Sequence, residues 1–81
     1  MMTRQEIFDA LKSVLEVIRP STDLSGVNDD TQLTRDLGID SLSMMLMALA
    51  IEDKCGMTFE TTHTPFVTVG ELISYIQSRQ G

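Results

Sequence analysis

Residues 40–56 read DSLSMMLMALAIEDKCG, and this stretch decides most of the fold. Asp40 is a favoured helix N-cap residue, and Gly56 is of the residue type that commonly ends a helix in the left-handed conformation. No proline or glycine interrupts the chain between them. The stretch therefore predicts one helix that starts near Asp40 and runs to about Lys54.

The apolar residues of this helix fall on two faces instead of one. One stripe follows the spacing i, i+3, i+4, i+7, i+11, and the other follows i, i+3, i+4, i+7 on roughly the opposite side. A helix in a small bundle normally buries a single stripe. The pattern leaves two interpretations open: the helix is buried all round, or one stripe is core and the other is a docking surface. The first stripe comprises Met44, Met47, Ala48, Ile51 and Cys55, and the second comprises Leu42, Met45, Leu46 and Leu49.

Two further helices are predicted, one on each side of this segment. Towards the N-terminus, Thr3 and Glu6 form a capping box before an apolar stripe, and a following proline ends a helix over about 4–19. Towards the C-terminus, Thr68 and Glu71 form a second capping box and start the last helix. The buried stripe of this last helix consists of Val69, Leu72, Ile73 and Ile76.

The segments between the predicted helices show no sustained periodicity. Residues 20–40 form a long loop, and its scattered apolar residues predict that it is pinned to the core. Residues 57–67 are irregular, with room for a short helical turn, and no strand pattern is present. The expected fold is all-α: a single domain over residues 1–81, built as a small bundle of three main helices plus a short helical turn, with a long loop between the first and second helices.

Composition limits the classes of function. The 81 residues carry a net charge of −6, which argues against nucleic acid as a partner because phosphate binding needs a concentrated basic surface. The single cysteine excludes an internal disulfide, no Cys/His cluster suggests a metal site, and no nucleophile–base pair points to an enzyme. The longest apolar run is too short to span a bilayer and no signal peptide is evident, so we expect a cytoplasmic monomer without membrane insertion.

Residues 36–42 read Asp-Leu-Gly-Ile-Asp-Ser-Leu and join the long loop to the second helix. Ser41 is expected in the first helical turn, where an anion attached to its hydroxyl would lie close to unpaired backbone N–H groups and the positive end of the helix dipole. Gly38 can supply a backbone conformation that other residues resist. A bare Asp-Ser-Leu would indicate a well-capped helix and nothing more.

The complete seven-residue motif resembles the phosphopantetheine attachment motif of acyl carrier proteins. The chain length, the acidic character and the motif's place between a long loop and a helix agree with that family, and residues 68–76 resemble its last helix. The resemblance implies a non-catalytic carrier that holds acyl groups as thioesters on a 4′-phosphopantetheine arm at Ser41. Asp40 matches the aspartate that assists transfer of the arm from coenzyme A by a phosphopantetheinyl transferase with Mg²⁺.

The same resemblance implies which surface the partners contact. The second helix is the family's main recognition element, so the stripe of Leu42, Met45, Leu46 and Leu49 would face outward, and the stripe that starts at Met44 would be buried. The expected partners are acyl-ligase, ketosynthase or acyltransferase-type enzymes of fatty acid, polyketide or related pathways.

The chain departs from the fatty-acid-synthesis pattern on this helix, since Ser43 and Leu46 stand where acids are usual. We therefore favour a specialised pathway with more hydrophobic docking. A primary fatty-acid carrier whose enzymes tolerate this surface is the competing hypothesis. A different class also stays open: an unmodified helical interaction domain would use the same apolar stripe to hold a partner helix, and its function would survive replacement of Ser41.

Overall fold

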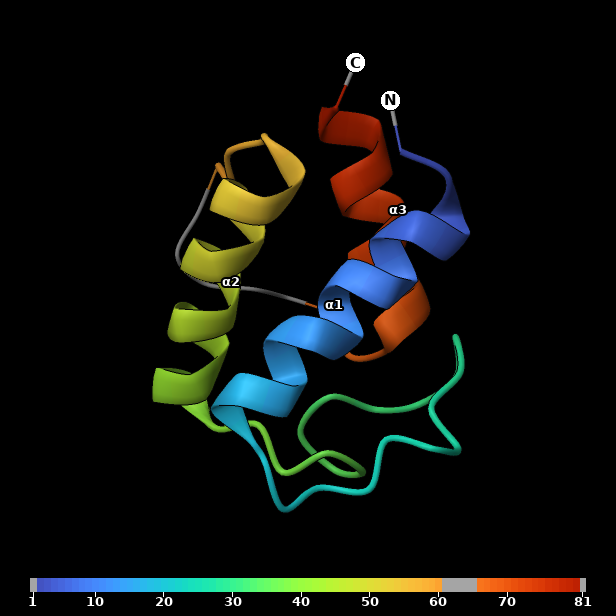
Figure 1. The fold of residues 1–81 in the computed structure, drawn as a ribbon, viewed down its shortest axis with the longest axis vertical. Coiled ribbons are helices and arrows are strands. Elements are labelled where there is room, and N and C mark those ends of the chain that lie inside the picture. Colours follow the sequence, from blue (N-terminus) through green and yellow to red (C-terminus); the bar gives the residue numbers. More distant parts are fainter. Residues whose placement is uncertain (1, 61–65, 81) are drawn as a thin grey trace.

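The computed structural model describes residues 2–60 and 66–80. It contains three helices in the order α1 (Arg4–Ile18), α2 (Ser41–Cys55) and α3 (Val69–Arg79), and the described residues form no strand. α1 packs against both α2 and α3, which make few contacts with each other. In Figure 1, α1 runs across the front of α3, its last turn lies beside the start of α2, and the long loop lies at one end of the bundle. The predicted all-α bundle is confirmed.

The predicted helix boundaries hold to within a residue. α1 ends at Ile18, and Arg19 is its C-cap, with a φ of −129° and a ψ of 68° that lie outside the helical region. α2 begins at Ser41 with Asp40 as its N-cap, and it continues to Cys55, one residue further than predicted. In the described ranges, no helix is long and apolar enough to cross a membrane.

Of the two predicted capping boxes, one is complete and one is half formed. At α1, the Thr3 hydroxyl accepts from the N–H of Glu6 at 3.2 Å, and the Glu6 carboxylate accepts from the N–H of Thr3 at 2.8 Å. At α3, the Thr68 hydroxyl accepts from the N–H of Glu71, but the Glu71 carboxylate accepts from the Thr68 hydroxyl instead of its N–H. Thr68 also forms an isolated antiparallel bridge with Gln32 of the long loop, directly before the helix starts.

The long loop is tied to α1 and to the start of α3. The Thr31 carbonyl accepts from the N–H of Val69 at 2.9 Å, and the Asp29 carbonyl accepts from the N–H of Gly70 at 2.9 Å. The Asp29 carboxylate also pairs with Arg4 of α1 at 3.1 Å. Three apolar side chains anchor the rest of the loop in the core, as the sequence predicts: Leu33, Leu37 and Ile39.

The second connection is held by Tyr75 of α3. The Phe59 ring stacks on the Tyr75 ring at a centroid distance of 5.4 Å, and the Phe66 ring lies at 5.0 Å with a tilt of 57°. The Tyr75 hydroxyl accepts from the N–H of Glu60 at 3.1 Å. One aromatic residue therefore fixes both described flanks of this connection to α3.

The short helical turn predicted within residues 57–67 is not seen in the described part of that segment. Residues 57–60 and 66–67 are irregular. The rest of the predicted turn, residues 61–65, lies outside the described residues.

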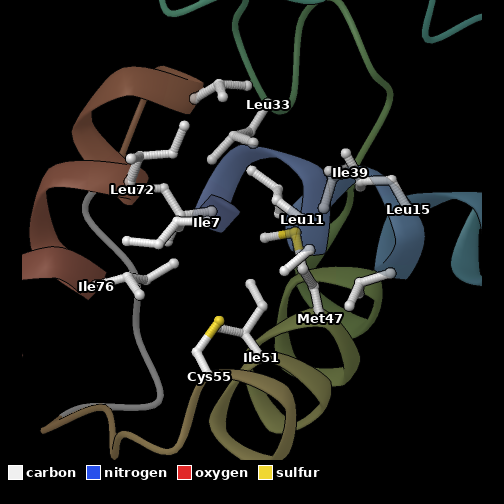
Figure 2. Close-up of a cluster of buried hydrophobic side chains, with 14 of the residues drawn as sticks. Ile7, Leu11, Leu15, Leu33, Ile39, Met47, Ile51, Cys55, Leu72 and Ile76 are labelled. Carbon is white, nitrogen blue, oxygen red and sulfur yellow. The ribbon is translucent and has the colours of Figure 1, made fainter. Parts of the chain in front are cut away.

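One hydrophobic core joins the helices and the loop. Figure 2 shows its side chains pointing from all four parts of the chain into a common interior. Burying an aliphatic side chain of this size contributes about 1.5–3 kcal/mol, so these residues supply most of the driving force for folding. The labelled members are Ile7, Leu11 and Leu15 of α1, Leu33 and Ile39 of the loop, Met47, Ile51 and Cys55 of α2, and Leu72 and Ile76 of α3.

Candidate functional site

Residues 36–42 form a tight turn that leads into α2. Gly38 has a φ of 67°, a left-handed conformation that glycine adopts without the strain other residues would meet. On either side of it, Leu37 and Ile39 are buried, and the N–H of Ile39 donates to the Leu33 carbonyl at 3.1 Å. The turn is thus fixed to the core just before the helix begins.

Asp40 caps α2 and is ionised at neutral pH. Its carboxylate accepts from the backbone N–H of Ser43 at 2.8 Å. The backbone N–H and the hydroxyl of Ser43 hold the pKa of Asp40 below its usual range, and the Arg19 guanidinium lowers that pKa further. A fixed negative charge therefore lies at the surface one residue before Ser41.

Ser41 is the first residue of α2 and is exposed. Its hydroxyl has no hydrogen-bond partner within residues 2–60 and 66–80, and the same holds for the backbone N–H groups of Ser41 and Leu42. Free N–H groups in the first turn of a helix favour an anion nearby. An accessible hydroxyl beside such donors fits the covalent attachment of a phosphate-linked group.

The two apolar stripes of α2 lie in opposite environments. Met47 and Ile51 are each 1% exposed, whereas Leu42 is 61% and Leu49 is 58% exposed. Met44, by contrast, is only partly buried at the edge of the core. The alternative of a helix buried all round is therefore wrong, and the outward stripe is the one expected from the resemblance. Its members, hereafter the outer face of α2, are Leu42, Met45, Leu46 and Leu49.

A groove of about 320 Å³ between α1 and α2 extends this apolar surface. Leu46 lines one wall and Val17 of α1 lines the other. Val17 is 81% exposed, more than any other large apolar side chain in the described part of the chain. The sequence pattern gives Val17 no role, and its position away from the centre of the apolar stripe of α1 is the one signal that points to it.

The remaining candidate groups do not build a second site. Cys55 is buried, and burial raises the pKa of its thiol against the opposing charge of Lys54, so the thiol stays protonated within the core. Among the residues that the structure describes, no cluster of His, Cys, Asp or Glu could hold a metal ion. His63, which the sequence left without a role, lies outside them.

Comparisons with known proteins match this combination of fold and motif. The family described as "Phosphopantetheine attachment site" matches residues 5–76, which include the motif turn and nearly all of the three helices. The acyl carrier protein of Thermotoga maritima is 32% identical over 82 residues, covering 100% of both chains. That of Beutenbergia cavernae is 37% identical over 81 residues, covering 96% of this chain and 95% of the relative.

A third relative has a more specific name. The meromycolate extension acyl carrier protein of Mycolicibacterium smegmatis is 34% identical over 76 residues, covering 93% of this chain and 76% of its own. Together the matches define the class, a small helical carrier domain with a phosphopantetheine attachment site. The chain belongs to the acyl carrier protein family, whose members carry acyl groups for biosynthetic enzymes and are not themselves catalysts.

Proposed function

We propose that Ser41 bears the 4′-phosphopantetheine group and that the chain, acting as one domain over residues 1–81, passes acyl thioesters between enzymes. The observation that carries this proposal is the exposed Ser41 hydroxyl at the start of α2, next to the ionised Asp40. The bound group supplies a terminal thiol, whose thioester is stable enough to carry and activated enough to transfer. Tethering an acyl group raises its effective concentration at each enzyme in turn.

Ser41 is proposed as the substrate of a phosphopantetheinyl transferase that uses coenzyme A and Mg²⁺. Its Oγ forms a bond to the phosphorus that carries pantetheine, while the bond from that phosphorus to the oxygen bridging the two phosphates breaks. The adenosine nucleotide leaves, and the serine proton passes to a base on the transferase. The carboxylate of Asp40 attracts the metal ion that accompanies coenzyme A, because hard divalent cations prefer oxygen ligands.

The outer face of α2 is the surface that we propose for docking of acyl-ligase, ketosynthase or acyltransferase-type enzymes. Its side chains are exposed on the same helix that begins at Ser41, so an enzyme bound there lies close to the carried group. Leu46 and Ser43 replace acids on this helix, which favours apolar contacts and a dedicated pathway over generic fatty acid synthesis. The protein is proposed to act as a cytoplasmic monomer.

Intact mass spectrometry tests the attachment. The folded chain is incubated with coenzyme A, Mg²⁺ and a broad-specificity phosphopantetheinyl transferase, beside Ser41→Ala and the matched control Ser43→Ala. We expect the wild type and Ser43→Ala to gain one phosphopantetheine and Ser41→Ala to gain none. A folded wild type that gains nothing would contradict the proposal and favour an unmodified interaction domain that uses the outer face of α2.

A further inference from the structure

Arg19 lies between the end of α1 and the motif turn. It is the C-cap of α1 and is partly buried. Its Nη2 atom lies 3.1 Å from the point where the first side-chain carbon at position 38 would stand if Gly38 were another residue. Figure 1 shows the last turn of α1 beside the first turn of α2, so the two ends meet at this place. The guanidinium therefore occupies space that glycine leaves open.

The donors of Arg19 are free to bind an anion. Arg4 and Arg79 are engaged in ion pairs with carboxylates. Arg19 makes no ion pair within 4 Å in the described part of the chain, and its side chain donates no hydrogen bond there. A guanidinium carries five N–H donors in a planar fork that matches the oxygens of a phosphate. A cation with unused donors thus lies against the turn that presents Ser41.

A phosphate on Ser41 would add negative charge to a region that already carries negative charge, and a nearby cation would reduce the repulsion. A phosphate joined to the Ser41 oxygen would stand one residue from the ionised Asp40, and like charges at this separation repel. The loop of residues 20–40 adds further acids, with Arg35 as its sole base. Arg19 is already close enough to Asp40 for its charge to act on that carboxylate. It is therefore placed to offset the repulsion that modification would create.

We propose that Arg19 is a positioning residue for the carried group: its guanidinium binds the phosphodiester on Ser41 and holds the base of the arm against the junction of α1 and α2. This inference rests on the proposed attachment at Ser41. Gly38 serves the arrangement twice, because it adopts the left-handed φ of the turn and leaves room for the guanidinium. The arm is then directed along the junction instead of rotating freely about the serine.

Nuclear magnetic resonance of the unmodified and modified chains tests the contact without any activity assay. The modified protein carries phosphopantetheine alone, with complete modification confirmed by intact mass. We expect the Arg19 Nε–Hε signal to shift on modification and its exchange with water to slow several-fold, while the Arg35 signal stays in place. We also expect the ³¹P signal of the phosphodiester to differ between the wild type and Arg19→Gln, whereas the control Arg35→Gln reproduces the wild type.

The outcomes separate this inference from the attachment itself. A wild-type chain that gains no mass contradicts the attachment. A modified wild type whose Arg19 signal does not move, with an unchanged ³¹P signal in Arg19→Gln, leaves the attachment standing and overturns the role of Arg19. Should Arg19→Gln fail to fold, the Arg19 signal of the wild type before and after modification decides alone. Arg19→Lys keeps the charge but lacks the fork, so its ³¹P signal should fall between those of the wild type and Arg19→Gln.

Discussion

The two faces of α2 are built from the same kinds of residue but lie in opposite environments. The inner face packs Met47 and Ile51 into the core at 1% exposure, while the outer face leaves Leu42 and Leu49 more than half exposed. Both faces follow helical spacing, so periodicity alone does not distinguish them. The placement of α1 decides which one is covered, because α2 packs mainly against α1 and only weakly against α3.

The difference supports the proposal that the outer face serves contacts outside the chain. An exposed row of large apolar side chains contributes less to the stability of the folded monomer than a buried row does, and such patches commonly mark interaction sites. The row starts one residue after Ser41 and continues across the groove to Val17. Under the proposed function, stability and recognition are divided between the two faces of one helix.

The largest expected effect is on the free energy of unfolding, and it appears as a contrast between a truncation on the inner face and one on the outer face. Ile51→Ala removes a side chain that is 1% exposed, so it should lower the free energy of unfolding by about 2–5 kcal/mol. Leu49→Ala removes a side chain that is 58% exposed and should change the free energy of unfolding by less than about 0.5 kcal/mol. Urea titrations of both variants measure the contrast. Equal losses would show that the two faces are not divided in this way.

The two glycines near the ends of α2 allow a second comparison, between the stability costs of alanine at each position. Gly38 and Gly56 both have left-handed φ values, so alanine at either position should cost roughly 1–2 kcal/mol in strain. Only the Gly38 position also meets the Arg19 guanidinium, and we expect Gly38→Ala to be the more damaging of the two. Gly26→Ala is the control, since its added carbon meets nothing within 4 Å. Thermal unfolding of the three variants gives the order of their stabilities. If Gly56→Ala lost as much stability as Gly38→Ala, contact with the Arg19 guanidinium would not add to the cost at position 38.

A charge on the outer face should alter partner choice without unfolding the domain. Leu46→Glu restores an acid where fatty-acid carriers usually have one, so loading and transfer by generic fatty-acid-synthesis enzymes should improve several-fold while coupling to the cognate enzyme weakens. The matched control is Val67→Glu, which places the same charge at another exposed apolar position, outside α2. Steady-state rates with both enzyme sets provide the measurement. If the wild type already works at full rate with the generic enzymes, the specialised pathway is wrong.

The smallest effect is a pH dependence at the start of α2. The folded-state pKa of Asp40 lies below its unfolded value because Ser43 favours the carboxylate, so its contribution to stability is present above about pH 3.9 and is lost as the pH falls through the lowered pKa. The wild type should therefore lose more thermal stability than Asp40→Asn as the pH falls from 5 into the acid range. Asp53→Asn is the control at the other end of α2. If the melting temperatures of the wild type and Asp40→Asn fell equally with pH, this assignment would be contradicted.

Local sequence predicts the helices well, because their ends depend on neighbouring residues. Thr3 with Glu6, and Asp40 with Gly56, act within a few positions of each helix end, and the structure places all of them as expected. The half-formed box at Thr68 fails for the opposite reason. The Glu71 carboxylate accepts from the Val67 N–H and the Thr68 hydroxyl instead, at a place where Thr68 also forms a bridge to Gln32, a residue far away in the sequence.

The site shows the same division between local and long-range information. Residues 36–42 alone predict that Ser41 lies in the first turn of α2 and that Gly38 has an unusual backbone conformation, whereas the choice of outer face required either the fold or the family resemblance. Arg19 gives only a weak signal in the sequence, as a base directly before Pro20. Its place against Gly38 arises only when α1 and α2 meet.

Locating the modified residue tests the central claim most directly. The chain is modified with coenzyme A and then fragmented in the mass spectrometer by a method that leaves the phosphodiester intact. Ser41 and Ser43 lie two residues apart, and fragments that break between them distinguish the two positions. We predict that the added phosphopantetheine is found on Ser41 in every modified molecule. Phosphopantetheine on Ser43 or on any other residue would contradict the account of how the turn, the cap and the outer face of α2 work together.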